Sequence, residues 1–145
     1  MNNKQNLLEE IHQYFPHDKR DIRSFSSLKL AYIGDAVFEI IIRTLIIEGT
    51  EGPVKHLHSR TSSLVNAGSQ AKLILALQEE LTEEERSVYR HGRNAKASSV
   101  ARHADIRDYR NATGLEALFG YLYLTGRSDR AVELCRIGLD KLHMI

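Results

Sequence analysis

The chain has 145 residues, of which 42% are hydrophobic and 27% are charged, and its formal net charge is +1. This length suits one domain over residues 1–145, and the composition is typical of a globular protein rather than of a disordered chain. Charged residues interrupt each apolar run well before the roughly 20 residues that a membrane-spanning helix needs, which excludes a transmembrane protein.

The first residues, MNNKQNLLEE, lack the basic-then-apolar order of a secretory signal, and the sequence has a single cysteine, Cys135. One cysteine cannot form an internal disulfide bond. We therefore expect a cytoplasmic protein that acts away from membranes and in which Cys135 is a buried, unreactive thiol.

Apolar residues recur at helical spacing along nearly the whole chain, and no segment alternates apolar and polar residues as a half-buried strand does. The sequence therefore predicts an all-α domain, with a bend near Gly68 between its third and fourth helices. In chain order, the expected helices cover about residues 5–14, 27–47, 53–68, 69–81, 83–92, 109–124 and 129–142.

Several residues have the chemistry of helix starts. They are Ser26 or Ser27 as an N-cap, Pro53 in a first turn, Thr82 with Glu85 as a capping box, and Ser128 as the last N-cap. Large apolar residues are scarce from Arg93 to Asp108, which predicts a partly irregular, exposed loop.

Charge is unevenly distributed along the second half of the chain. Five glutamates and no basic residue lie between Glu79 and Glu85. The segment from Arg86 to Arg110 then holds seven basic residues against two aspartates. Because local basic patches attract phosphate backbones, this segment points to RNA or DNA as a partner.

Two carboxylates stand alone in apolar stretches, Asp35 in LAYIGDAVF and Glu116 in GLEALFG. A carboxylate taken out of water becomes protonated, pairs with a cation or binds a metal ion. From the residues alone, a salt bridge to an arginine and a divalent-metal site are equally supported. Glu39 and Arg43 share the helical stripe of Asp35 and suit a surface ion pair, while the other sides of that helix are apolar, which predicts a central position.

The remaining polar residues do not form other common catalytic patterns. His56 and His58 are two residues apart, so on a helix they diverge by about 200° and cannot easily share a metal ion. The sequence also lacks zinc-ligand spacing, a Gly-x-Ser-x-Gly elbow and a phosphate-binding glycine loop.

Residues 30–39, LAYIGDAVFE, resemble the signature helix of ribonuclease III domains, and residues 113–120, TGLEALFG, resemble their second carboxylate helix. The closer likeness is to Mini-III ribonucleases, the short bacterial members that lack a double-stranded-RNA-binding domain. Three further stretches carry the same resemblance in the same order, namely residues 57–71, 92–96 and 109–110.

The resemblance implies a homodimer with the helical bundle of a ribonuclease III endonuclease domain, which cleaves double-stranded RNA with Mg²⁺, or Mn²⁺ as a substitute. Asp35 and Glu116 match the catalytic, metal-binding carboxylates, and water attack on phosphorus leaves 5′-phosphate and 3′-hydroxyl ends. Tyr32 matches an aromatic residue of the dimer interface, with core packing as the alternative. The implied substrate is the precursor of large-subunit (23S) ribosomal RNA, with a ribosomal protein as a candidate helper.

The same resemblance implies contacts with the sugar-phosphate backbone, since double-stranded RNA is recognised mainly by shape. The candidate RNA-binding residues are Arg90, Arg93, Asn94 and Lys96, followed by Lys55, His58 and Arg60. For each of them, a solvated surface charge is the alternative.

The chain also departs from the family pattern. Leu28, Ala31 and Thr113 replace acidic residues of the full-length enzymes, and His91 and Gly68 replace an arginine and a lysine that are common at those positions. The reduced acidic set leaves two further functions open. One is a non-catalytic helical dimer that binds structured RNA, and the other is a protein-interaction bundle with salt bridges at Asp35 and Glu116.

Overall fold

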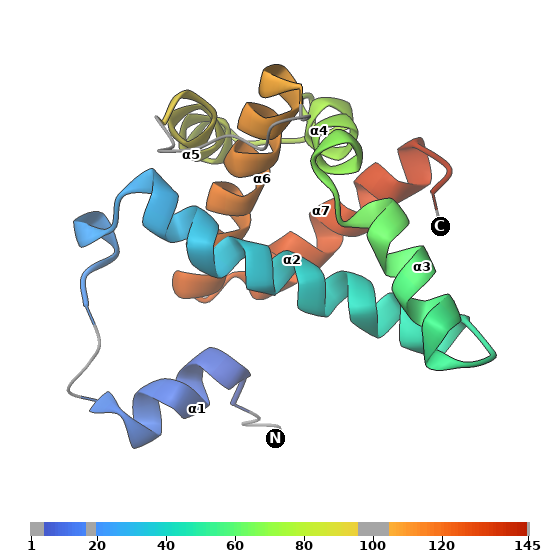
Figure 1. Ribbon diagram of the computed structural model, residues 1–145. Coiled ribbons are helices and arrows are strands. Elements are labelled where there is room, and N and C mark those ends of the chain that lie inside the picture. Colours follow the sequence, from blue (N-terminus) through green and yellow to red (C-terminus); the bar gives the residue numbers. More distant parts are fainter. Residues whose placement is uncertain (1–4, 17–19, 96–104, 145) are drawn as a thin grey trace.

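The computed structural model describes residues 5–16, 20–95 and 105–144, and within these ranges it is helical and has no strand (Figure 1). The prediction of an all-α fold is confirmed. None of these helices combines the length and the hydropathy that crossing a bilayer requires. The elements are α1 (Leu7–Tyr14), the 3-10 helix η2 (Ile22–Ser24), α2 (Ser27–Gly49), α3 (Val54–Leu64), α4 (Ala67–Ala76), α5 (Glu83–Asn94), α6 (Ile106–Leu124) and α7 (Ser128–Lys141).

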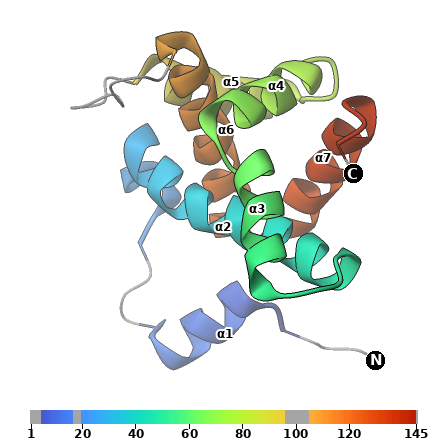
Figure 2. The same cartoon turned by 45° about the vertical axis from the view of Figure 1, so that its right-hand side comes forward.

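Helix α6 is the centre of the fold, and it packs against α2, α4, α5 and α7 (Figures 1 and 2). Ten of its residues are buried, whereas α2 keeps an exposed side along its length. The expectation that α2 is central was therefore wrong. Most sides of α2 carry apolar side chains, but part of that apolar surface faces outward.

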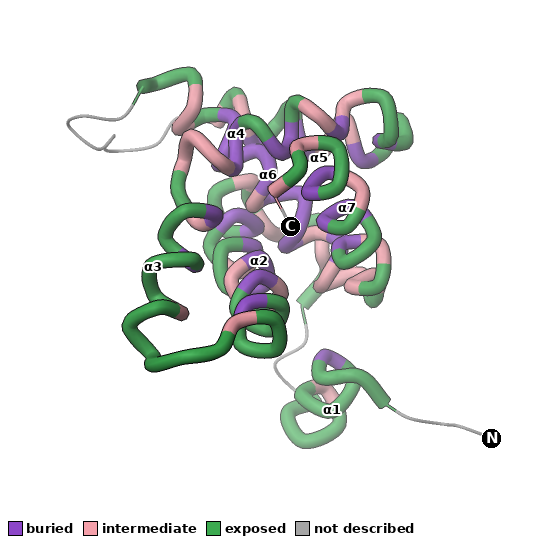
Figure 3. The backbone as a smooth tube through the Cα atoms, turned by 90° about the vertical axis from the view of Figure 1, so that its right-hand side faces the viewer, coloured by how far each residue is buried: buried purple, intermediate pink, exposed green. Residues whose placement is uncertain are grey.

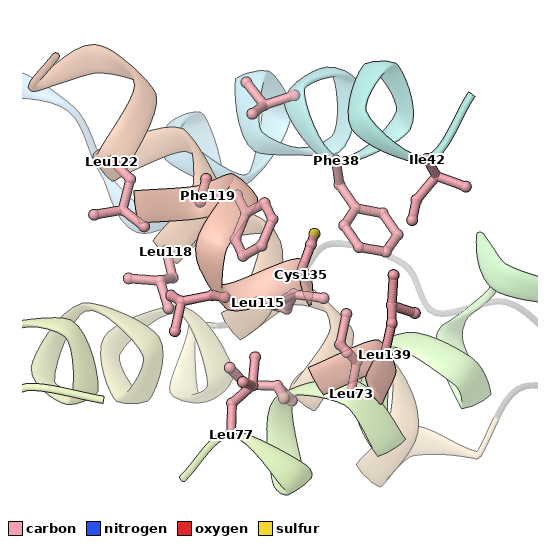
Figure 4. Close-up of a cluster of buried hydrophobic side chains, with 14 of the residues drawn as sticks. Phe38, Ile42, Leu73, Leu77, Leu115, Leu118, Phe119, Leu122, Cys135 and Leu139 are labelled. Carbon is pink, nitrogen blue, oxygen red and sulfur yellow. The ribbon is translucent and has the colours of Figure 1, made fainter. Parts of the chain in front are cut away.

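The main core lies where α2, α4, α6 and α7 meet (Figure 4). Phe38 of α2 and Phe119 of α6 pack edge to face, with ring centroids 5.7 Å apart. Cys135 of α7 points into the same cluster, and burial raises the pKa of its thiol to about 12. The prediction that Cys135 is buried is confirmed, and its raised pKa disfavours the reactive thiolate.

Helices α2 and α6 cross with their backbones in contact, and two glycines make this contact possible. A Cβ atom on Gly34 would lie 1.6 Å from the carbonyl oxygen of Glu116, and one on Gly120 would lie 2.0 Å from the carbonyl oxygen of Leu30. No side chain fits at either position. The crossing therefore fixes α2 against the turn of α6 that carries Glu116.

Several helix boundaries differ from the predicted ones. Asn66 accepts a hydrogen bond from the backbone of Ser69 and starts α4, so the chain turns at Asn66 rather than near Gly68. Helix α4 then ends at Ala76, before the predicted end at Leu81. Pro53 is the N-cap of α3 rather than its first residue, and Ser128 is the first residue of α7 rather than its cap.

The predicted capping box of Thr82 and Glu85 is present at the start of α5. Both ends of the predicted irregular segment are helical, because α5 continues to Asn94 and α6 begins at Ile106 behind its cap Asp105. Residues 96–104 of that segment lie outside the described residues. Lys96, a candidate RNA-binding residue, lies outside the described residues.

Helix α1 has a predicted apolar side, but little of that side is covered. Of its residues only Leu8 is buried, while Leu7 and Ile11 are 63% and 41% exposed (Figure 3). Tyr14 and the adjoining Phe15 are also exposed. Helix α1 therefore contributes little to the core, and the helices from α2 onward position the functional site.

Candidate active site

The structure brings Asp35 and Glu116 together from two helices. Asp35 follows Gly34, whose backbone touches the backbone of Glu116, so the α2–α6 crossing itself places the two side chains side by side. Their carboxyl groups interact by charge and by a hydrogen bond. The sequence predicted such a meeting, but only as one arrangement that two apolar helices could adopt.

The two carboxyl groups differ in exposure. Asp35 is exposed, which corrects the expectation that its apolar surroundings remove it from water, whereas Glu116 is half-buried. Asp35 lies on the outer side of α2, directly beside the Gly34 contact. One carboxylate is therefore open to a ligand from solvent, and the other forms the inner wall of the site.

Burial raises the pKa of Glu116 to about 8, and the negative charge of Asp35 adds to the increase. Without a cation, the pair holds a proton at neutral pH because two adjacent carboxylates repel each other. A divalent cation between them favours the charged forms and reverses this shift.

No salt bridge neutralises the pair within the part of the chain that the structure describes. The arginines that form ion pairs there do so with other acids, for example Arg43 with Glu39 at 2.7 Å and Arg130 with Glu85 at 2.8 Å. The Glu39–Arg43 ion pair is the predicted one. In these residues the structure thus gives no support to salt bridges at Asp35 and Glu116.

Gln70 of α4 is a site residue that the sequence analysis did not identify. Its side chain is 4% exposed, and its Nε2 atom donates to Oε2 of Glu116 at 3.5 Å. This hydrogen bond favours the ionised carboxylate and opposes the rise in the pKa of Glu116. Gln70 lay inside the stretch that resembles the family, but an amide in an apolar helix gives no signal of its target.

The donor set suits Mg²⁺, which takes one or two carboxylates and completes its shell with water and phosphate oxygens. Among the described residues, no group of three or more His, Cys, Asp or Glu side chains could hold a metal ion. Ala31 and Thr113 are buried, and the Thr113 hydroxyl donates to the Tyr109 carbonyl. These positions cannot supply the missing carboxylates, so among the described residues Asp35 and Glu116 are the carboxylates that would hold the ion.

The predicted RNA-binding residues fall in two separate places. Arg90, Arg93 and Asn94 lie on α5, which packs on α6 and α2. Lys55, His58 and Arg60 lie on α3, which packs on α2 and α4 toward the other end of α2 (Figure 1). Arg60 also donates to the Thr50 hydroxyl at 2.8 Å. These six residues therefore do not form a single patch within one chain.

The exposed side of α2 carries apolar residues beside the Glu39–Arg43 ion pair, and Tyr32 is the most exposed of these apolar residues at 83%. This exposure excludes core packing as the role of Tyr32. The α2 stripe comprises Leu28, Tyr32, Ile40 and Ile47, which are 39% to 83% exposed and recur at helical spacing.

Known proteins are similar to this chain in sequence and in fold. The family model described as the ribonuclease III domain matches residues 28–127. The chain is 44% identical to Mini-ribonuclease 3 of Clostridium tetani over 123 residues, which cover 84% of this chain and 82% of that protein. It is also 44% identical to Mini-ribonuclease 3 of Enterococcus faecalis over 125 residues, or 85% and 95% of the two chains.

A solved structure also has a similar fold. The crystal structure of a Fusobacterium nucleatum protein superposes with a TM-score of 0.74 at 28% sequence identity. The match covers 85% of this chain and 98% of that one.

Proposed function

The chain belongs to the ribonuclease III family as an endoribonuclease of the Mini-ribonuclease 3 type, and on this premise we propose that it cleaves double-stranded RNA with Mg²⁺ held by Asp35 and Glu116. One observation carries the proposal. Two carboxylates from different helices meet at a backbone contact, one of them exposed, and no cation pairs with them among the described residues.

The residues of the site have distinct roles in this proposal. The half-buried Glu116, with Gln70 donating to it, forms the fixed side of the site, and the exposed Asp35 faces the RNA. A bound divalent ion supplies Lewis acidity that activates water and stabilises the charge that develops on the phosphate. Water attacks phosphorus and the 3′ oxygen leaves, so hydrolysis produces 5′-phosphate and 3′-hydroxyl ends.

Cleavage of a long duplex RNA by the purified protein tests this function. We expect Mg²⁺-dependent cutting that Mn²⁺ also supports, and a loss of more than about 100-fold in Asp35→Asn and Glu116→Gln. Glu39→Gln is the matched control, because it removes a carboxylate from the next turn of α2. Activity that survives either substitution would refute the assigned roles, and RNA binding without cleavage under any divalent ion would favour the non-catalytic dimer.

We also propose a homodimer that forms through the α2 stripe. A row of apolar side chains this exposed on one helix suits a self-complementary, two-fold interface. Tyr32→Asp should convert a dimer into a monomer in light scattering, whereas Val132→Asp, on the exposed side of α7, should not. A wild-type monomer at micromolar concentration would contradict this.

The proposed cellular substrate is the precursor of 23S ribosomal RNA in the cytoplasm, with a ribosomal protein as a helper in presenting the stem. The candidate RNA contacts remain Arg90, Arg93, Asn94, Lys96, Lys55, His58 and Arg60. Mapping the ends of the ribosomal RNA in cells that carry Asp35→Asn tests the substrate. Uncut precursor should accumulate, and mature ends in those cells would point to another RNA.

A further inference from the structure

Helix α1 is covered on one side only. Leu8 is buried, and Ile11 lines a hollow together with Phe25, which lies just before the start of α2. Helix α1 is therefore held beside the N-terminal end of α2 in its own chain (Figure 1). Its other apolar side, which carries Leu7 and Tyr14, faces solvent.

Leu7, Ile11 and Tyr14 form one row along α1, because they are spaced by four and three residues. They are 41% to 76% exposed, and we call them the α1 row. A helix of eight residues is too short to be stable in water by itself, and one buried leucine adds little support. The described part of one chain thus leaves uncovered the row whose packing would stabilise α1.

A second uncovered apolar surface lies toward the other end of α2, in a groove of about 310 Å³ between α2 and α3. Ile40, Ile47 and Val54 line this groove and are 63% to 64% exposed. Arg43 and His58 also contribute to its wall. We call it the α2–α3 groove. Apolar residues that are this open to solvent indicate a surface that binds another protein segment.

The α1 row and the α2–α3 groove belong to helices of opposite charge. Helix α1 has Glu9 and Glu10 in its first turn and contains neither lysine nor arginine. Helix α3 contains Lys55 and Arg60 and has no acidic residue. An apolar, acidic helix therefore suits an apolar groove that runs beside a basic helix.

The groove of the same chain is out of reach of α1. Ile40 and Ile47 lie about 20 and 30 Å from Ser27 along the axis of α2, whereas α1 lies beside Phe25 at the start of α2. Figure 1 shows the same separation, with α3 at the far end of α2. When two α2 stripes pair about a two-fold axis that crosses the helices, the α2 helices run antiparallel. The start of α2 in one copy then lies beside the groove of the other.

We infer that the α1 row of one copy packs into the α2–α3 groove of a second copy of this chain. The groove adjoins the α2 stripe, because Ile40 and Ile47 belong to both. Each dimer contains the contact twice, once at each end of the paired stripes. The inference rests on the homodimer of the proposed function, and it adds to that dimer a helix that precedes the ribonuclease III domain, which begins at residue 28.

The strength of the dimer gives the first test. Tyr14→Asp places a charge in the α1 row and should raise the Kd of the dimer at least about tenfold in sedimentation equilibrium. Gln13→Asp is the matched control, because it adds the same charge to the last turn of α1 at an exposed position outside the row. Its Kd should equal that of wild type. Neither residue belongs to the core, so thermal melting should show two folded variants.

Cross-linking between two variants shows which chains the contact joins. Tyr14→Cys and Val54→Cys proteins are mixed, left to exchange subunits and treated with a flexible bismaleimide. We expect a covalent dimer from this mixture and none from Tyr14→Cys mixed with Val132→Cys, since Val132 is an exposed residue of α7. Wild type gives the background, because Cys135 is buried and its thiol has a raised pKa.

The outcomes distinguish this contact from the proposed function. The contact of α1 would be overturned, and the homodimer retained, if wild type is a dimer and Tyr14→Asp keeps the wild-type Kd. A dimeric wild type with no covalent dimer from the Tyr14→Cys and Val54→Cys mixture would have the same meaning. A monomeric wild type would refute the proposed homodimer and this inference with it.

Discussion

The backbone of Gly34 touches the backbone of Glu116, because a Cβ atom on Gly34 would lie 1.6 Å from the Glu116 carbonyl oxygen. The contact that joins α2 to α6 therefore includes the backbone of one site residue, Glu116, and directly adjoins the other, Asp35. Folding and the geometry of the site depend on the same few atoms.

Gly34→Ala should accordingly damage stability and activity together. The added methyl group meets main-chain atoms that cannot rotate away, so we expect a loss of about 3 kcal/mol in unfolding free energy. Any folded fraction should also lose metal-dependent cleavage, since the helices must move apart. Gly49→Ala is the matched control on the same helix, because nothing lies within 4 Å of its Cβ position. Denaturant unfolding and a cleavage assay on both variants measure this, and equal stability would contradict it.

The raised pKa of Glu116 predicts how stability varies with pH in the metal-free protein. Unfolded Glu116 ionises near 4.5, whereas the folded protein keeps its proton to about 8, so the contribution of Glu116 to stability falls across this range. Glu116→Gln has no such proton. The melting temperature of Glu116→Gln minus that of wild type should therefore be higher at pH 8 than at pH 5. We expect this increase to be at least about 3 °C, roughly the effect of 1 kcal/mol. A difference that does not change with pH would contradict the raised pKa.

Gln70 should act by orienting Glu116 rather than by touching the RNA. Gln70→Met keeps the size of the buried side chain but removes the donor to Oε2, so the Mg²⁺ concentration for half-maximal cleavage should rise about tenfold. The maximal rate at saturating Mg²⁺ should change less. Gln78→Met is the control, because its side-chain amide donates to the Ile74 carbonyl of its own segment rather than to a site residue. The same metal requirement in wild type and Gln70→Met would contradict this role.

The ion pair between Arg130 and Glu85 should be important for stability but not for cleavage. Glu85 is 2% exposed, and Arg130 is its charged partner at 2.8 Å. Arg130→Ala leaves that buried carboxylate without its cationic partner, which should cost about 3–5 kcal/mol. Arg136→Ala, which breaks the exposed pair with Asp140, should cost less than about 1 kcal/mol.

The pH dependence of Arg130→Ala provides an independent check. Arg130 lowers the pKa of Glu85, so the stabilisation is complete above the unfolded value and is lost as the pH falls through the folded value. The difference between wild type and Arg130→Ala should therefore shrink in acid. A constant difference down to pH 3 would point to lost packing instead of lost charge pairing.

The sequence predicted the helical fold and the candidate carboxylates because both depend on local patterns. Apolar spacing defines helices, and the lone charges of Asp35 and Glu116 stand out against it. It placed α2 at the centre because periodicity shows that a side chain is apolar but not what covers it. The turn at Asn66 was missed since its capping bond to Ser69 is visible only in three dimensions.

Contacts between distant segments account for the other differences. Arg86 belongs to the basic segment, yet its guanidinium donates to the Gln78 and Leu81 carbonyls and supports the start of α5. Gln70 reaches Glu116 across 46 positions of sequence, and no spacing rule connects them. Charge and polarity identify candidate residues, but tertiary packing decides which of them meet.

Helix α6 carries Glu116 and is the most enclosed element of the fold, since ten of its residues are buried. Its packing against α2, α4, α5 and α7 holds the backbone of Glu116 in one place relative to the crossing with α2. In the proposed enzyme the substrate therefore has to adapt to the carboxylate pair, because the helix that carries Glu116 cannot shift to meet it.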